Sequence, residues 1–355
     1  MRLSAMLMCL WALAASASDV GAELTAGGTR ATVNNPRSGY AGALLNGAWD
    51  INDTFGLNGA VGFTHDNGTM KGDVDAKGSN IWLFQLAADA LLSDHFLLSA
   101  GLTASPASTG QSATTITADI PRLGRTETVP ALISTTSSSL GGILMLAFGT
   151  HGDGKWEHSL NASTQLMRFG VAEKLTPDLS GLPLKDRVTA KEVEGFCANH
   201  LELPGCRVLT QPQNASLLQA RLQLAYIATL FGDNDVGLDF SYYLYDHDPT
   251  ETGFFSVATF GRISLGDTPN AIAPIQWTLK PSYVHRFGKV TLKLWVQYGQ
   301  YVPGQGYDTA AGAKLEWKIT RHWKVYVLGQ GQRDVDASGN GLGSGSGVLG
   351  ATWTF

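Results

Sequence analysis

Hydrophobic and polar residues alternate with a period of two along most of the chain. The alternation is clear in segments 55–64, 82–90, 96–104, 218–229 and 290–298. Successive side chains of a β-strand point to opposite faces, so this period predicts strands with one apolar face and one more polar face. The pattern predicts an all-β protein, either a soluble sandwich or a membrane barrel.

The connections between the predicted strands alternate between short and long, which favours the membrane barrel. The short connections lie near residues 52–54, 93–94, 151–154, 232–235, 287–288 and 320–322. The longer ones lie near residues 67–79, 107–132, 170–213, 247–273 and 334–346. Transmembrane barrels have short turns on the periplasmic side and longer loops outside.

Tryptophans gather beside the short connections, at Trp49, Trp156, Trp317, Trp323 and Trp353. Aromatic residues form girdles at both membrane–water interfaces of such barrels. With the first strand near residues 23–33 and residues 253–264 in an outer loop, the chain forms about 14 strands. We therefore predict a transmembrane antiparallel up-and-down β-barrel, within a range of 12–16 strands.

The last strand carries Leu349, Ala351, Trp353 and Phe355 on one face and ends on the aromatic residue. It resembles the C-terminal signal of Gram-negative outer-membrane β-barrels, and the mature chain as a whole resembles a porin-like barrel. The resemblance implies insertion by the barrel assembly machinery, which would read the strand ending at Phe355. It also implies a place in the cell outer membrane, in contact with lipid and lipopolysaccharide.

The N-terminus is typical of a cleaved signal peptide. Arg2 precedes an apolar run from Leu3 to Ala15, and Ala15-Ser16-Ala17 is a small-residue cleavage site. We expect residues 1–17 to be removed, with cleavage after Ala22 as the alternative. Residues 23–355 would then form a single barrel with long outer loops near 107–132, 170–213 and 247–273.

Composition agrees with export and a membrane barrel. Only 15% of residues are charged and 42 are glycine, where a soluble protein carries about a quarter charged residues. The net charge of -5 argues mildly against a nucleic-acid partner. Cys197 and Cys206 remain after processing, and an exported chain with one close pair predicts a loop disulfide.

The polar faces of the predicted strands indicate which charged side chains line the lumen. The predicted basic pore-lining residues are Lys280, Arg286, Lys293, Lys314, Lys318, Lys324 and Arg221. The acidic ones are Asp50, Asp89, Glu157, Asp239 and Glu316. Because the two sets are separated in sequence, we expect a basic wall opposite an acidic wall and a weak preference for anions. The alternative is that these charges only pair with one another in a filled lumen.

Three short motifs could carry other chemistry. Asp334, Asp336 and Ser338 match the first half of a calcium loop, but the acid expected at its twelfth position is Gly345, so a polar hairpin loop is favoured. Asp246-His247-Asp248 and His158-Ser159 suggest an outer-membrane hydrolase. Neighbouring positions of a strand point to opposite faces, so His158 cannot activate Ser159.

Together these patterns predict an outer-membrane pore for passive diffusion of small hydrophilic solutes, without catalytic residues, metal or cofactor. Two alternatives remain open. One is a structural or partner-bound barrel of an envelope secretion, polysaccharide-export or motility complex, and the other is an outer-membrane hydrolase. A homo-oligomer is compatible with all three.

Overall fold

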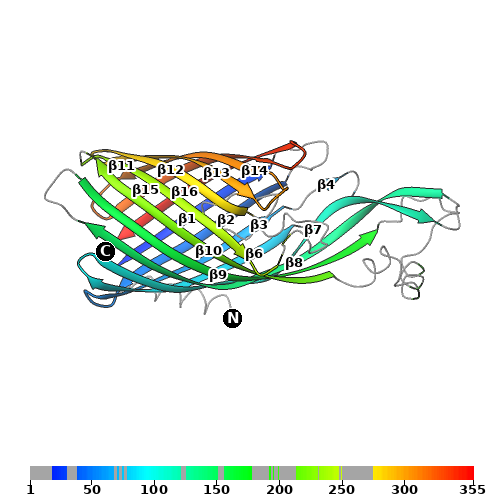
Figure 1. The fold of residues 1–355 in the computed structure, drawn as a ribbon, viewed down its shortest axis with the longest axis horizontal. Coiled ribbons are helices and arrows are strands. Elements are labelled where there is room, and N and C mark those ends of the chain that lie inside the picture. Colours follow the sequence, from blue (N-terminus) through cyan, green and yellow to red (C-terminus); the bar gives the residue numbers. More distant parts are fainter. Residues whose placement is uncertain are drawn as a thin grey trace.

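The computed structural model describes residues 18–29, 38–67, 70–71, 74–75, 78–120, 125–150, 156–177, 192, 195, 199, 213–230, 232–247, 249 and 275–355. Within these residues the chain forms one closed antiparallel barrel of fourteen strands, which confirms the predicted fold class and strand count (Figure 1). None of the described residues forms a helix with the length and hydrophobicity needed to cross a membrane.

The barrel has an up-and-down order, in which each strand pairs with the barrel strands before and after it along the chain. The exception is the closing pair of the first and last strands. The barrel strands are β1 (Asp19–Thr29), β2 (Ser38–Asp50), β3 (Phe55–Asp66), β6 (Ser79–Ser93), β7 (Phe96–Ile120), β8 (Arg125–Thr150), β9 (Trp156–Pro177), β10 (Gln213–Leu230), β11 (Asn234–Tyr245), β12 (Ile275–Phe287), β13 (Val290–Tyr301), β14 (Tyr307–Lys318), β15 (Trp323–Val335) and β16 (Gly341–Thr354). Between β3 and β6, β4 (Met70–Lys71) and β5 (Val74–Asp75) form a separate small hairpin.

The barrel closes where β1 pairs with β16, from Asp19 opposite Thr354 to Thr29 opposite Ser344. The first strand therefore begins earlier than the predicted residue 23, because residues 19–22 find partners on both β16 and β2. Within the barrel wall, closure leaves no strand edge with unpaired backbone groups, which is the condition for β-structure in lipid.

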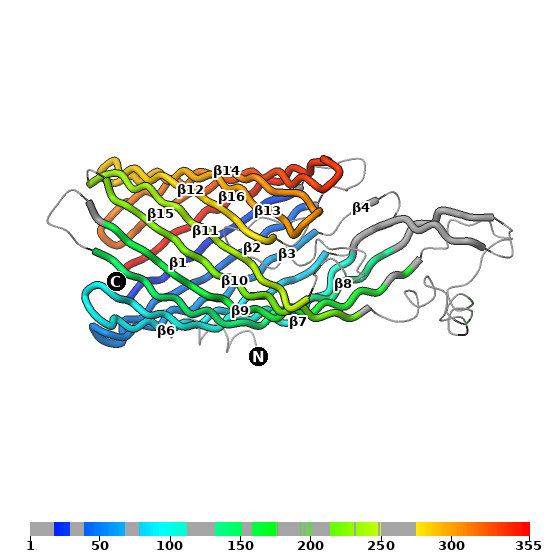
Figure 2. Tube along the Cα trace, viewed as in Figure 1, coloured from blue at the N-terminus to red at the C-terminus, as the bar shows by residue number. Residues whose placement is uncertain are grey.

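Both ends of the described chain meet at one end of the barrel, where the N–H of Phe355 donates to the carbonyl of Ser18. The tight turns at residues 51–54, 94–95, 232–233, 288–289 and 319–322 lie at this end. Figure 2 shows the C-terminus at the same end of the barrel as the turn between β6 and β7. We assign this end to the periplasm, because barrels of this kind have their short turns there.

The segment near 107–132, predicted as a long outer loop, is instead a paired hairpin that extends β7 and β8 beyond the outer rim (Figure 1). Its register runs without interruption from Ser108 opposite Ser137 to Ile120 opposite Arg125. The segment is rich in β-branched Thr, Ile and Val, which suit a strand, and pairing satisfies its backbone groups outside the membrane.

The bounds of the strands give the lengths of two other predicted connections. β9 ends at Pro177 and β10 begins at Gln213, close to the predicted loop 170–213, whereas the connection after β15 is only residues 336–340. The predicted signal peptide, the pair Cys197 and Cys206, and segment 253–264 lie outside the described residues.

The two faces of each strand differ in exposure, as the period-2 pattern predicts. The outward face carries exposed apolar side chains, with Leu24, Leu102 and Leu349 at 61%, 66% and 60% exposure. Aromatic residues collect at the short-turn end, where the rings of Trp323 and Trp353 pack edge to face with centroids 4.8 Å apart. This outward surface has the composition of a lipid-facing wall with an aromatic girdle.

We predict that the mature chain begins at Ser18. Cleavage after Ala22 would remove residues that pair with β16 and β2, and each lost backbone hydrogen bond costs about 0.5–1.5 kcal/mol net. The intact mass of the protein from membranes would identify the first residue. A variant lacking residues 18–22 should unfold at lower urea concentration; a native chain starting at Glu23, or a deletion without effect, would contradict the prediction.

Candidate functional site on the inward face

The six basic residues predicted from the C-terminal half lie on inward positions of four consecutive strands. They are Lys280 and Arg286 on β12, Lys293 on β13, Lys314 and Lys318 on β14, and Lys324 on β15. Exposed outward residues such as Leu294 and Leu315 alternate with them. The register places Lys293 opposite Lys314 and Lys318 opposite Lys324. These six residues, here called the basic wall, are therefore contiguous, and most lie toward the short-turn end.

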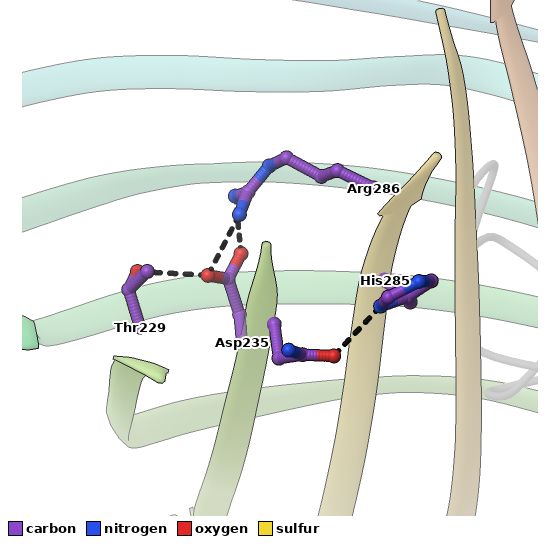
Figure 3. Close-up of polar contacts among 5 residues, drawn as sticks. Thr229, Asp235, His285 and Arg286 are labelled. Atoms are coloured by element: carbon purple, nitrogen blue, oxygen red, sulfur yellow. Dashed lines mark hydrogen bonds and ion pairs between the residues drawn. The ribbon is translucent and has the colours of Figure 1, made fainter. Parts of the chain in front are cut away.

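Arg286 is neutralised within the basic wall by Asp235 on β11 (Figure 3). Its two terminal nitrogens donate to the two carboxylate oxygens, with Nη1 at 3.0 Å from Oδ1. Thr229 donates to the same Oδ1 at 2.7 Å. A bidentate pair of this kind fixes the guanidinium at the periplasmic end, so Arg286 adds little net charge to the lumen.

Two lysines of the basic wall lie against aromatic rings. The Nζ of Lys314 is 3.9 Å from the ring centroid of Tyr326 and 3.5 Å from Glu316. The Nζ of Lys280 is 5.3 Å from the centroid of Trp295. Lys293, Lys318 and Lys324 form no side-chain ion pair or hydrogen bond in the described part of the chain. These three residues carry the uncompensated positive charge of the wall.

The predicted acidic residues do not form an opposing wall. Glu316 lies within the basic wall, and Asp239 on β11 is opposite Lys280 on its edge. Asp89 on β6 lies across the barrel and accepts a hydrogen bond from Asn58. Asp50 is exposed at the periplasmic end of β2, and the side chain of Glu157 lies outside the described part.

Arg221, the predicted basic residue of β10, belongs to a polar chain across the inward face. It donates to the amide oxygen of Gln223, whose nitrogen donates to Asp239. Ser163 on β9 donates to the same Gln223 oxygen at 3.3 Å. The chain links Arg221 to Asp239 through an uncharged side chain, so both charges are partly satisfied inside the barrel.

A buried acidic pair, Asp308 and Asp334, lies toward the outer end of the strands that carry the basic wall. The two residues are direct cross-strand neighbours on β14 and β15 and are 0% and 1% exposed. Tyr301 and Gln332 both donate to Oδ1 of Asp334, and Gln297 donates to Oδ2 of Asp308 at 3.2 Å. The remaining oxygens, Asp308 Oδ1 and Asp334 Oδ2, have no hydrogen-bond partner among the described residues.

On this side of the barrel the ionisable groups are therefore separated along the pore axis, with two buried carboxyl groups toward the outer end and most of the lysines toward the periplasmic end. The separation follows from strand direction and register: β14 and β15 each carry a carboxylate near the outer end and lysines near the periplasmic end. Sequence alternation places Asp308 and Asp334 inward, but only the register shows that they are opposite each other.

The calcium-loop match at Asp334, Asp336 and Ser338 is a hairpin turn. The carboxylate of Asp336 accepts the N–H groups of Ser338 and Asn340, both at 2.9 Å, while Asp334 is bound inside the barrel. Hydrogen bonds from the backbone and side chain of Asn340 hold the pKa of Asp336 below its usual value. Gly339 has φ of 83°, a conformation that favours glycine. The described residues hold no group of three or more His, Cys, Asp or Glu suited to a metal.

The residues considered for hydrolysis lie at opposite ends of the barrel. Asp246 and His247 contact each other at 2.7 Å on the outer rim, where Asp246 also accepts the N–H of Leu218. His158 lies near the periplasmic end on the outward face and stacks on Tyr226. Asp248 lies outside the described part. The described residues therefore do not bring these groups into one site.

An apolar cluster also faces inward, so the inward face is not uniformly polar. Met167, Phe169 and Leu217 pack together on β9 and β10, with Tyr245 of β11 against them. Tyr245 donates to the carbonyl of Ile275 at 2.6 Å and accepts from Gln219. These residues follow the alternation of their strands, but their packing across two hairpins is not visible in the sequence.

The fold is that of known outer-membrane channels. No protein-family model matches the chain, and no curated protein sequence is significantly similar to it. The "CymD monoaromatic hydrocarbon channel" is 10% identical with a TM-score of 0.55, over 96% of this chain and 89% of that one. A Pseudomonas aeruginosa FadL homologue is 13% identical with a TM-score of 0.59, over 95% and 90%. At these identities the similarity shows a shared barrel fold.

We expect Asp308→Asn to stabilise the barrel by about 0.5–1 kcal/mol, because like charges directly opposite each other on a sheet are destabilising. Asparagine keeps an oxygen for the hydrogen bond from Gln297. Urea unfolding of the reconstituted barrel, followed by the gel shift between folded and unfolded forms, would measure it. The matched control is Asp239→Asn, which removes a carboxylate opposite Lys280 and should destabilise. A shift of both variants in the same direction would contradict the prediction.

Proposed function

We propose that this protein is an outer-membrane channel through which small hydrophilic solutes diffuse passively, with a weak preference for anions. The observation that carries the proposal is the basic wall, in which Lys293, Lys318 and Lys324 lie on inward positions of adjacent strands and have no side-chain partner among the described residues. No catalytic step is needed, because a fixed charge acts on any ion that passes near it.

The strand number supports an interior wider than side chains alone can fill. Barrels of roughly eight strands are filled by their own inward side chains, and the diameter grows with strand number. This barrel has fourteen strands. A charged wall in such an interior biases which ion enters, because the Debye length at physiological salt is about 8 Å.

The buried acidic pair explains why the preference should be weak. In the outer half of the wall an anion would pass Asp308 and Asp334, which are buried in the wall, and in the periplasmic half it would pass the lysines without a side-chain partner in the described part of the chain. The lysines are more exposed than the two carboxylates, so their charge acts more strongly on a passing ion. The net effect favours anions without excluding cations.

The preference can be measured as the reversal potential of single-channel currents in a KCl gradient across a planar bilayer. A unit charge at 4 Å in water contributes about 1 kcal/mol, so reversing one wall charge should change the permeability ratio by roughly severalfold. We expect Lys293→Glu and Lys324→Glu to shift the reversal potential toward cations.

The control is Lys174→Glu, which reverses a charge on the exposed outward face of β9 beyond the rim. It should leave the reversal potential unchanged. An equal shift in all three variants would indicate a general surface-charge effect and contradict the role of the basic wall. A folded wild-type barrel without current would favour a partner-bound barrel.

A second candidate is the passage of small aromatic or other apolar solutes, favoured by the inward cluster of Met167, Phe169, Leu217 and Tyr245. The similar structures include a protein described as a monoaromatic hydrocarbon channel. Apolar side chains on an inward face can hold an apolar solute during passage, since burial of its surface is favourable.

For this candidate we expect Leu217→Gln to lower toluene flux into proteoliposomes by roughly tenfold, because a polar side chain in the cluster would weaken apolar contacts with toluene, and each CH₂-sized group of a solute that is buried contributes about 0.8 kcal/mol. Ion conductance should change little. Leu328→Gln is the matched control, because Leu328 faces inward on β15, away from the cluster. Equal toluene flux with and without protein would rule out this candidate.

A further inference from the structure

A groove of about 560 Å³ lies on the outward face of β7, β8, β9 and β10. It is present because Gly142 has no side chain in a surface made of leucines. Leu102 and Leu166 are its cross-strand neighbours, and Leu140 and Leu144 lie two residues away on the same face of β8. Leu102 and Leu140 are 66% and 63% exposed, so the groove is open to whatever surrounds the barrel.

Glycine is not required at this position by the backbone. A Cβ at Gly142 would lie 3.4 Å from the carbonyl oxygen of Gly101 and 3.7 Å from Leu102, which are ordinary contacts. By contrast, a Cβ at the neighbouring inward Gly141 would overlap the carbonyl oxygen of Leu166 at 2.3 Å. The groove at Gly142 can therefore be filled by substitution without changing the sheet.

Arg168 lies at the outer end of this groove, between Leu140 and Leu218 in the register. Its side chain is exposed and forms no ion pair or hydrogen bond in the described part of the chain. Leu218, the cross-strand neighbour of Arg168, is hydrogen-bonded to Asp246, which directly follows the end of β11. Arg168 therefore lies at the height of the outer end of β11. An arginine on the lipid face is costly at the midplane of the bilayer and tolerated near the interface.

We propose that this groove binds lipopolysaccharide of the outer leaflet, with one acyl chain in the groove at Gly142 and a lipid phosphate on Arg168. A guanidinium binds phosphate through two parallel hydrogen bonds, and the unpaired Arg168 offers both. The leucine-lined groove suits a hydrocarbon chain, which has no polar groups to satisfy. The assignment to the outer leaflet rests on the proposed outer-membrane location.

The test is native mass spectrometry of the full barrel in detergent, titrated with lipid A that carries two phosphates and, separately, with phosphatidylglycerol. We expect Arg168→Gln to weaken lipid A binding by roughly tenfold, as expected for a lost charge-assisted contact. Gly142→Leu should weaken it as well, through the acyl chain. The matched control is Arg333→Gln, because Arg333 is also exposed and outward near the outer end of β15 but is not among the residues that line this groove.

Three results would overturn the proposal. Equal loss in the Arg168 and Arg333 variants would indicate general attraction of anionic lipid. Binding of phosphatidylglycerol as tight as that of lipid A would show a site for any anionic phospholipid. A second copy of the chain on the groove, seen as a dimer lost in Gly142→Leu, would identify a protein interface instead.

Channel currents recorded on the same variants separate this inference from the proposed function. Arg168 and Gly142 face away from the lumen, so neither variant should change conductance or reversal potential. If wild type conducts no current but binds lipid A through Arg168, the channel proposal fails and the lipid site stands. If Gly142→Leu does not fold, shown by its gel migration, Arg168→Gln and its control still decide the outcome.

Discussion

The pairing of β1 with β16 is the constraint on which the rest of the structure depends. Every other pair in the barrel joins strands that follow one another along the chain, apart from the small hairpin between β3 and β6, while this pair joins Asp19 to Thr354 and Thr29 to Ser344. In lipid, an unpaired backbone group has no water to replace its partner, so an open sheet edge is not tolerated. Closure divides the side chains into an inward and an outward set, and both candidate sites follow from that division.

On the inward set, the register decides the electrostatics. The hairpin of β14 and β15 places Lys318 opposite Lys324 at one end and Asp308 opposite Asp334 at the other. Both pairings bring like charges together, which lowers stability. Sequences that keep such unfavourable local choices often do so at functional sites, and here the charges line the interior proposed to conduct solutes.

On the outward set, the absence of one side chain, at Gly142, creates the proposed lipid site. Gly142 leaves an opening among four leucines, and Arg168 adds one unpaired positive charge at its outer end. The membrane that requires closure of the barrel also makes such a charge costly unless it lies near the interface. The position of Arg168 beside the end of β11 agrees with that requirement.

The sequence by itself determined the all-β barrel, the number of strands and the inward face of each strand, because period-2 alternation and turn spacing are local properties. It also led to the prediction that the basic residues of β12–β15 line the lumen. The prediction of a loop at residues 107–132 was wrong, because this Thr- and Ser-rich segment forms a paired hairpin.

Only the tertiary structure decided which side chains meet. The neutralisation of Arg286 by Asp235, the pairing of Asp308 with Asp334 and the separate roles of Asp334 and Asp336 all depend on contacts between strands or within a closed turn. Alternation tells which face a residue takes, but the register between strands sets its neighbours, and that register is fixed by the turns and by closure of the whole barrel.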